Sequence, residues 1–182
     1  MPSFEYTLIK RADFALLGEW LSTSHVARWW DDDPSPGAIE SGYGGCVDGT
    51  EPAEVFIVRC DGAPVGLIQR YRIGAYPQYA SDIAGIVELP EDTTSIDYLI
   101  GPPNALRKRL GTAMIAAFVA RTWQDWPATS SMIVPVHADN RASWRALERA
   151  GFVRVAAGEL APDNPIDSRA HYLYQQARFL HK

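Results

Sequence analysis

One continuous stretch, Ile96 to Ala120, constrains the fold of this 182-residue chain more than any other. A short apolar segment, Ser95 to Ile100, is rich in residues that favour β-strands. The Gly-Pro-Pro sequence at 101–103 must end that strand, because proline lacks the N–H that a β-ladder needs and its φ is restricted. From Leu110 onward apolar residues recur every three or four positions, which predicts a helix with one apolar stripe.

The loop before this helix carries three cations, Arg107, Lys108 and Arg109, followed by Gly111. The first N–H groups of a helix have no partner within it, and the helix dipole adds partial positive charge, so the backbone alone can bind an anion. Glycine allows close backbone approach, and arginine adds bidentate contacts to phosphate. Two interpretations stay open from this stretch alone: a phosphate-binding turn, or an ordinary connection with a solvated basic patch.

Composition and charge limit the class of protein. Hydrophobic residues make up 47% of the chain and charged residues 21%, which is typical of a globular protein with a proper core. A net charge of −5 argues against nucleic acid as a partner and suits a cationic small molecule. Because we find no basic leader and no apolar run of about 18 residues, we expect a soluble cytoplasmic protein without a membrane partner. The spacing of the two cysteines and four histidines predicts neither a disulfide nor a metal site.

Other elements are predicted from periodicity and turn signals. Two segments, 35–53 and 74–90, are expected to be loops, the first with a short helix at best, because the first is rich in glycine and proline and the second alternates aromatic and polar residues. Asp61-Gly62 predicts a hairpin turn. The remaining strands are expected at 4–9, 54–60, 64–73, 131–136, 153–156 and 171–175, and the remaining helices over 14–21 and 142–150.

Two adjacent tryptophans, Trp29 and Trp30, precede three consecutive aspartates at 31–33. Adjacent residues cannot share one face of a helix or strand, so at least one ring is not plain core. An aromatic plane beside carboxylates suits a sugar or a cation. A purely structural role, in which both rings cap the first helices, stays open.

The order of these elements, with Glu148-Arg-Ala-Gly-Phe152 closing the last helix, resembles the GNAT N-acetyltransferase superfamily. Three local matches resemble its aminoglycoside 6'-N-acetyltransferases: Glu19-Trp20-Leu21 running to Ser24-His25-Val26 and the tryptophan pair, Gly66 with Gln69 and Tyr71, and Ile96-Asp97 before an apolar strand. The resemblance covers most of the chain. It implies an α+β fold, with a single domain over residues 1–182 and a central mixed, mostly antiparallel, splayed β-sheet flanked by helices.

The resemblance also implies an activity, the transfer of an acetyl group from acetyl-coenzyme A to a primary amine, in the first place the 6'-amine of an aminoglycoside. Pantetheine would pair with the strand edge, and the phosphates would sit on the basic turn. The residues that the resemblance assigns to the coenzyme are Leu99, Ile100, Arg107, Lys108, Arg109, Leu110, Gly111, Thr112 and Asn140. The residues predicted to bind a small cationic amine substrate, from these matches and from the charges and aromatic planes that such a substrate needs, are Trp29, Trp30, Gln69, Tyr71, Asp82, Glu88 and Asp97.

Asp97 is also the predicted catalytic residue. The amine must attack as the free base, and a carboxylate on the central strand can accept its proton directly or through water. Asp97 alternates with Leu99 on an otherwise apolar strand, and the resemblance places it just before the thioester. The alternative is a surface aspartate at the start of a strand.

Four positions depart from the family's pattern. The phosphate loop lacks its first Arg or Gln, which is Leu106 here, and its first glycine, which is Arg109. Leu147 replaces a tyrosine that protonates the thiolate in many members, and Pro135 replaces an acidic residue of the resistance enzymes. Two alternatives therefore stay open: an acetyltransferase of another amine, such as a siderophore intermediate, a peptide or a small polyamine, and a catalytically weakened coenzyme A-binding protein. A monomer or a homodimer is expected.

Overall fold

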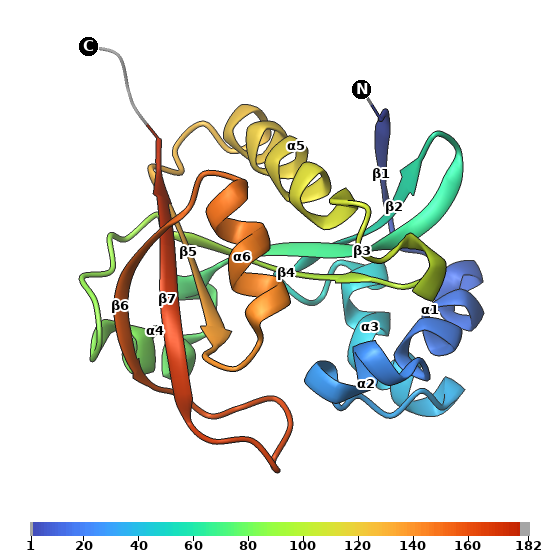
Figure 1. The fold of residues 1–182 in the computed structure, drawn as a ribbon, viewed down its shortest axis with the longest axis horizontal. Helices are drawn as coiled ribbons and strands as arrows, with labels where there is room; N and C mark the ends of the chain where they lie inside the picture. Colours follow the sequence, from blue (N-terminus) through green and yellow to red (C-terminus); the bar gives the residue numbers. More distant parts are fainter. Residues whose placement is uncertain (1, 179–182) are drawn as a thin grey trace. The chain divides into compact units, whose positions relative to one another are not determined.

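Seven strands and six α-helices lie within residues 2–178, which are the residues that this computed structural model describes (Figure 1). The strands are β1 (Phe4–Leu8), β2 (Glu54–Cys60), β3 (Ala63–Arg72), β4 (Thr94–Ile100), β5 (Ser131–His137), β6 (Val153–Glu159) and β7 (Ala170–Ala177). The α-helices are α1 (Phe14–Leu21), α2 (Ser24–Trp30), α3 (Pro36–Asp48), α4 (Pro77–Ala84), α5 (Leu110–Asp125) and α6 (Arg141–Arg149). Short 3-10 turns are η1 (Arg11–Asp13), η2 (Ile73–Ala75) and η3 (Pro103–Ala105).

All seven strands belong to one sheet, in the order β1-β2-β3-β4-β5-β7-β6. Four neighbouring pairs, β1–β2, β2–β3, β5–β7 and β6–β7, are antiparallel, whereas β4 and β5 are parallel. The register between β4 and β5 is Thr94↔Met132, at the first residue of β4. A mixed, mostly antiparallel sheet with helices confirms the predicted fold class.

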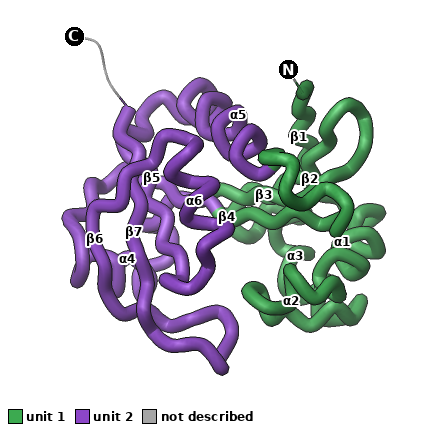
Figure 2. The backbone as a smooth tube through the Cα atoms, in the orientation of Figure 1, with its two compact units in different colours: residues 1–70, 97–110 green, residues 71–96, 111–182 purple. Residues whose placement is uncertain are grey.

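Two compact units make up the chain (Figure 2). Unit 1 comprises residues 1–70 and 97–110, and therefore holds α1 to α3, β1, β2, most of β3 and the second half of β4. Unit 2 comprises residues 71–96 and 111–182, and holds α4, nearly all of α5, α6 and strands β5 to β7.

The core of unit 1 lies between its helices and strands. Leu17, Trp20 and Leu21 of α1 are buried with Ile39 of α3, and they belong to one cluster with apolar strand residues such as Ile57. The β2–β3 hairpin turns through Asp61 and Gly62, which have φ of 49° and 82°, as the predicted Asp-Gly turn requires. Burial of the apolar side chains in this cluster supplies the main stabilisation of unit 1.

Helix α3 contradicts the expectation of a loop with a short helix at best over residues 35–53. The Ser35 side chain accepts a hydrogen bond from the N–H of Ala38, Pro36 occupies the first turn, and Gly49, with φ of 71°, ends the helix. Proline and glycine at these places favour helix termini, so here they mark the two ends of a helix and not a loop. Burial of Ile39 and Tyr43 then outweighs the low helix propensity of the internal glycines.

Helix α4 likewise replaces part of the loop expected over residues 74–90. Pro77 stands in its first turn, where a missing N–H costs nothing. Ile83 is fully buried in a cluster with Ile73, Ile133 and Leu173. Tyr79 and Ala80 of the same helix pack against this cluster, so one apolar face and its tertiary partners stabilise α4.

In unit 2, helices cover both faces of the β5-β7-β6 strands (Figure 1). Leu173 of β7 packs in the cluster that contains Ile83 of α4. The hydroxyl of the next residue, Tyr174, donates to Glu148 of α6 at 3.0 Å. Since successive strand residues point to opposite faces, α4 and α6 lie on opposite sides of these strands.

Two glycines in unit 1 allow the end of β4 to lie close to its neighbours. A Cβ at Gly66 would clash with the carbonyl oxygen of Leu99, and a Cβ at Gly101 would clash with the indole of Trp20. The N–H of Gly101 also donates to the carbonyl of Val65 at 3.0 Å. The end of β4 is thus held against β3 and α1.

Gly101→Ala is expected to destabilise the protein by about 1–3 kcal/mol, because the new methyl group must displace a packed indole ring. The free energy of unfolding is measured by urea denaturation. Gly42→Ala in α3 is the matched control, since nothing lies within 4 Å of a Cβ there. That control should be neutral or stabilising by up to about 1 kcal/mol. Equal stability of the two variants would contradict the close packing at Gly101.

Candidate functional site

Asp97 and Gln69, both predicted site residues, are brought together in unit 1. The Gln69 Nε2 of β3 donates to the Asp97 Oδ2 of β4 at 2.8 Å, and both side chains are half-buried. A neutral amide stabilises a carboxylate by hydrogen bonding without cancelling its charge. Asp97 is therefore oriented by this contact and can still attract an ammonium group.

A second polar pair in unit 1 joins Tyr43 of α3 to Asp32. The Tyr43 hydroxyl donates to Asp32 Oδ2 at 3.2 Å. Burial raises the pKa of Tyr43, and the negative charges of Asp32 and Asp97 raise it further. Burial also raises the pKa of Asp32, while the hydrogen bond from Tyr43 lowers it and the charge of Asp31 raises it. Tyr43 is thus a protonated donor within the electrostatic range of Asp97.

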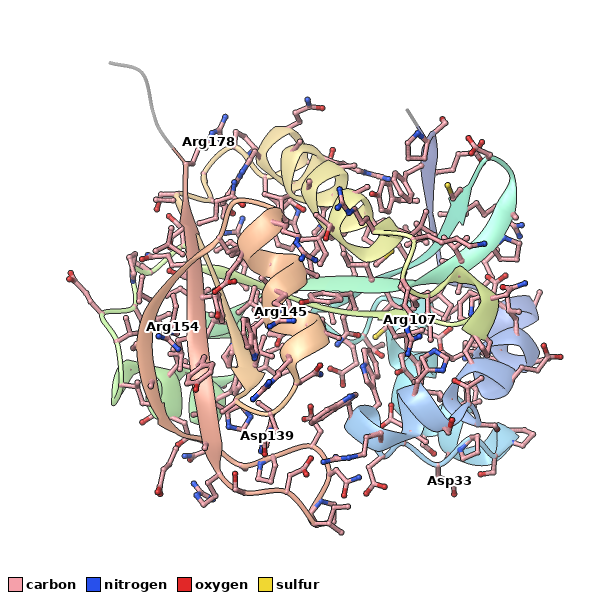
Figure 3. The ribbon with its side chains drawn as sticks, viewed as in Figure 1. Asp33, Arg107, Asp139, Arg145, Arg154 and Arg178 are labelled. Carbon is pink, nitrogen blue, oxygen red and sulfur yellow. The ribbon has the colours of Figure 1, made fainter. Side chains whose placement is uncertain are left out.

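The two tryptophans have different surroundings. Trp29 and Trp30 form the end of α2, and both are half-buried. The guanidinium of Arg28 lies over the Trp29 ring, 4.2 Å from its centroid, whereas Trp30 packs against the core of α1 and α3. One face of Trp29 therefore already carries a cation of the chain itself. The aspartates follow directly, and Figure 3 shows Asp33 in the segment after α2.

Leu99 and Ile100 were both predicted to form the strand edge for the coenzyme, but their backbone groups face opposite sides of β4. The carbonyl of Leu99 lies against Gly66 of β3, and its side chain is buried in the core of unit 1. The carbonyl of Ile100, by contrast, lies 2.8 Å from Nε2 of His25. Successive peptide groups of a strand point to opposite sides, so the backbone groups of Ile100 face away from β3.

The basic turn has a backbone conformation that favours glycine, although arginines occupy it. Arg107 and Arg109 have φ of 62° and 57°, in the left-handed region that favours glycine, at a cost of about 1–2 kcal/mol per residue. Both side chains and that of Lys108 are exposed, and among residues 2–178 no carboxylate pairs with them. Figure 3 shows Arg107 in this loop before α5. Three cations at the start of α5 can hold phosphate groups.

The other predicted residues belong to unit 2. Tyr71 is buried, and its ring meets that of Tyr76 edge-on with centroids 5.3 Å apart. Asp82 of α4 accepts a hydrogen bond from Gln78 at 3.0 Å and is exposed, as is Glu88. These two carboxylates are therefore open to solvent.

Asn140 and the first turn of α5 complete the predicted coenzyme residues. The Asn140 side chain accepts a hydrogen bond from the N–H of Ser143 at 3.1 Å and caps α6. The side-chain oxygen of Asn140 thus has a structural role as the N-cap of α6. Gly111 and Thr112, both half-buried, stand in the first turn of α5, where N–H groups lack helical partners.

Sequence reasoning missed the contacts of Tyr43 and His25. Tyr43 lay in a segment expected to be a loop, although the spacing of Ile39 and Tyr43 after Ser35-Pro36 was an available helix signal. The His25 contact joins residues 75 positions apart, which no local pattern reveals.

Among residues 2–178, no group of three or more histidine, cysteine, aspartate and glutamate side chains could hold a metal ion. None of the described helices combines the length and apolar character that crossing a membrane requires.

Comparison with known proteins gives consistent relatives. The Acetyltransferase (GNAT) domain family matches residues 10–160. Proteins from Klebsiella pneumoniae and Serratia marcescens, each named aminoglycoside N(6')-acetyltransferase type 1, are 29% identical over 162 residues, or 87% of this chain and 77% of theirs. The crystal structure of aminoglycoside acetyltransferase AAC(6')-Ib with coenzyme A has a TM-score of 0.83 at 26% identity, over 97% of this chain and 95% of that one. The same enzyme with coenzyme A and kanamycin has a TM-score of 0.81, at the same identity and coverage.

Tyr43→Phe is expected to raise the pKa of Asp32 further, because the donor that favours its charged form is removed. The pKa is measured by NMR titration of the carboxyl carbon. A raised native pKa means that Asp32 favours the native state when protonated, and that this contribution is lost as pH rises through the native pKa. In Tyr43→Phe, this contribution of Asp32 to stability should therefore be lost only at a higher pH than in the wild type. Tyr79→Phe is the control, and an unchanged Asp32 pKa in Tyr43→Phe would rule out the hydrogen bond in solution.

Proposed function

The chain belongs to the GNAT acetyltransferase family and is an acetyl-coenzyme A-dependent N-acetyltransferase, and from this premise we propose that it acetylates the 6'-amine of an aminoglycoside. The observation that carries the proposal is the hydrogen bond from Gln69 to Asp97, because it orients a charged carboxylate on β4. The relatives that are named aminoglycoside N(6')-acetyltransferases support the choice of substrate.

Asp97 acts as the base in this proposal. The amines of amino sugars are largely protonated at neutral pH, and the carboxylate takes that proton directly or through water. The free amine then attacks the thioester carbonyl, a C–N bond forms, and the C–S bond breaks with release of the coenzyme thiolate. The nitrogen gives up its second proton to water as the amide forms. Leu147 is fully buried and has no ionisable proton, so it cannot protonate the thiolate. We assign this step to water, since a thiolate is already a fair leaving group.

The coenzyme is held by the end of β4 and by the basic turn in this proposal. An extended pantetheine chain can add to a strand edge as another strand would, and Ile100 presents its backbone groups on such a side. The phosphates bind the cations and N–H groups from Arg107 to Thr112. The exposure of those cations and the absence of described carboxylate partners support this assignment.

Acidic side chains in unit 1 favour a polycationic substrate. Asp32 and Asp97 both act on Tyr43 electrostatically, so two negative charges gather near one buried hydroxyl. Exposed ion pairs contribute only about 0–1 kcal/mol each, hence several must act together. Substrate affinity should therefore fall as salt is added.

Some broader features belong to the same proposal. We infer a single GNAT-like domain over residues 1–182, which is supported by one family match running from residue 10 to residue 160. We also propose a cytoplasmic enzyme that works as a monomer or homodimer.

Steady-state acetylation of a panel of amines tests the substrate. Kanamycin-type and ribostamycin-type compounds should be preferred over lysine derivatives, peptides and small polyamines, with an apparent affinity that falls with salt. NMR of the product should place the acetyl group on the 6'-nitrogen. Preference for a singly charged amine without a salt effect would instead favour another amine, as Pro135 in place of an acidic residue suggests.

Asp97→Asn is expected to lower turnover by about 10²–10⁴-fold, because the side chain keeps its shape and loses its proton-accepting charge. Circular dichroism and coenzyme titration check that the fold and coenzyme binding are kept. Asp61→Asn removes an exposed carboxylate from the β2–β3 turn, where asparagine tolerates the positive φ, and serves as the matched control. Turnover of Asp97→Asn within about twofold of wild type across the pH range would exclude Asp97 as the base.

A further inference from the structure

The last residues of β4 are packed from two directions by apolar and backbone groups of unit 1. On the side of β3, the N–H of Gly101 donates to Val65, and the carbonyl of Leu99 lies against Gly66. On the side of α1, the indole of Trp20 lies so close to Gly101 that no larger residue fits. The peptide group between these contacts belongs to Ile100.

His25 of α2 makes the side-chain hydrogen bond to that peptide. Its Nε2 lies 2.8 Å from the Ile100 carbonyl oxygen. A carbonyl only accepts, so Nε2 carries a hydrogen, which is true of the imidazolium and of one neutral tautomer. The contact can therefore persist whether or not the ring is charged. Val26, the next residue of α2, is buried in the core and anchors the helix that carries the ring.

The hydrogen bond between His25 and Ile100 lies on the side of β4 that faces away from β3. Leu99 and Gly101 turn their polar backbone groups toward β3, so the groups of Ile100 point to the opposite side. A ligand that adds to β4 as an extra strand must meet that side. The His25 ring occupies one acceptor position of the Ile100 carbonyl and fixes the orientation of the peptide plane.

We propose that His25 is a positioning residue for the coenzyme, holding the Ile100 peptide in the orientation to which the pantetheine arm of acetyl-coenzyme A binds. The inference rests on the proposed acetyl transfer and adds a residue to which no role has been given above. His25 touches no reacting atom and acts through the backbone of Ile100. Its removal should weaken coenzyme binding selectively, because Asp97 is held separately by Gln69.

Steady-state kinetics of His25→Ala test this role. The KM for acetyl-coenzyme A and the Kd for coenzyme A from titration calorimetry should both rise about five- to tenfold, which corresponds to the loss of one hydrogen bond. The KM for the amine and kcat should stay within about twofold. His25→Gln, whose amide can donate from a similar position, should restore most of the coenzyme affinity. Ser24→Ala, an exposed neighbour on α2, should behave as wild type.

His25→Leu keeps apolar bulk without a donor and replaces His25→Ala if that variant does not fold. An unchanged KM for acetyl-coenzyme A would overturn the proposal. So would a parallel rise of both KM values, or a loss that His25→Gln does not rescue, because each indicates a general structural role. The coenzyme titration needs no amine. Wild type that binds coenzyme A but acetylates no aminoglycoside would therefore refute the proposed substrate and leave the role of His25 standing.

Discussion

The close approach of β3 to the second half of β4 at Gly66 is the constraint on which the candidate site depends. Because Gly66 has no side chain, the Leu99 carbonyl can lie against it, and this contact sets the distance between the two strands. Farther along the same strands, Gln69 then reaches Asp97 at 2.8 Å. A wider separation would lengthen that hydrogen bond, so a backbone contact controls the orientation of the proposed base.

Neutral donors accompany the acidic groups in this part of unit 1. Gln69 donates to Asp97, and Tyr43 donates to Asp32. Arg70, which directly follows Gln69, is buried but pairs with Glu54 at 2.7 Å. Hydrogen bonds from amides and hydroxyls orient carboxylates without themselves cancelling the negative charge. The net charge of −5 favours the approach of a cationic substrate.

The basic turn holds two arginines in a backbone conformation that favours glycine. Arg107 and Arg109 have φ of 62° and 57°, in the left-handed region. Non-glycine residues persist there only when the surrounding structure imposes the conformation, and such strain concentrates at functional sites. In return the turn presents guanidinium groups where a glycine would offer only backbone N–H groups.

Local chemistry in the sequence by itself determined most strands, helices α1, α5 and α6, the Asp61-Gly62 turn and the family of this protein. Alternation, helical spacing and turn residues act over a few positions, so they can be read without a structure. Tertiary packing stabilises α3 and α4, in which burial of Ile39, Tyr43 and Ile83 outweighs weak local propensity, although Ser35, Pro36 and Gly49 mark the ends of α3 locally. It also decided the contacts of His25 with Ile100 and of Gln69 with Asp97, because they join residues far apart in the chain, and only the packing of helices and strands determines which distant side chains meet.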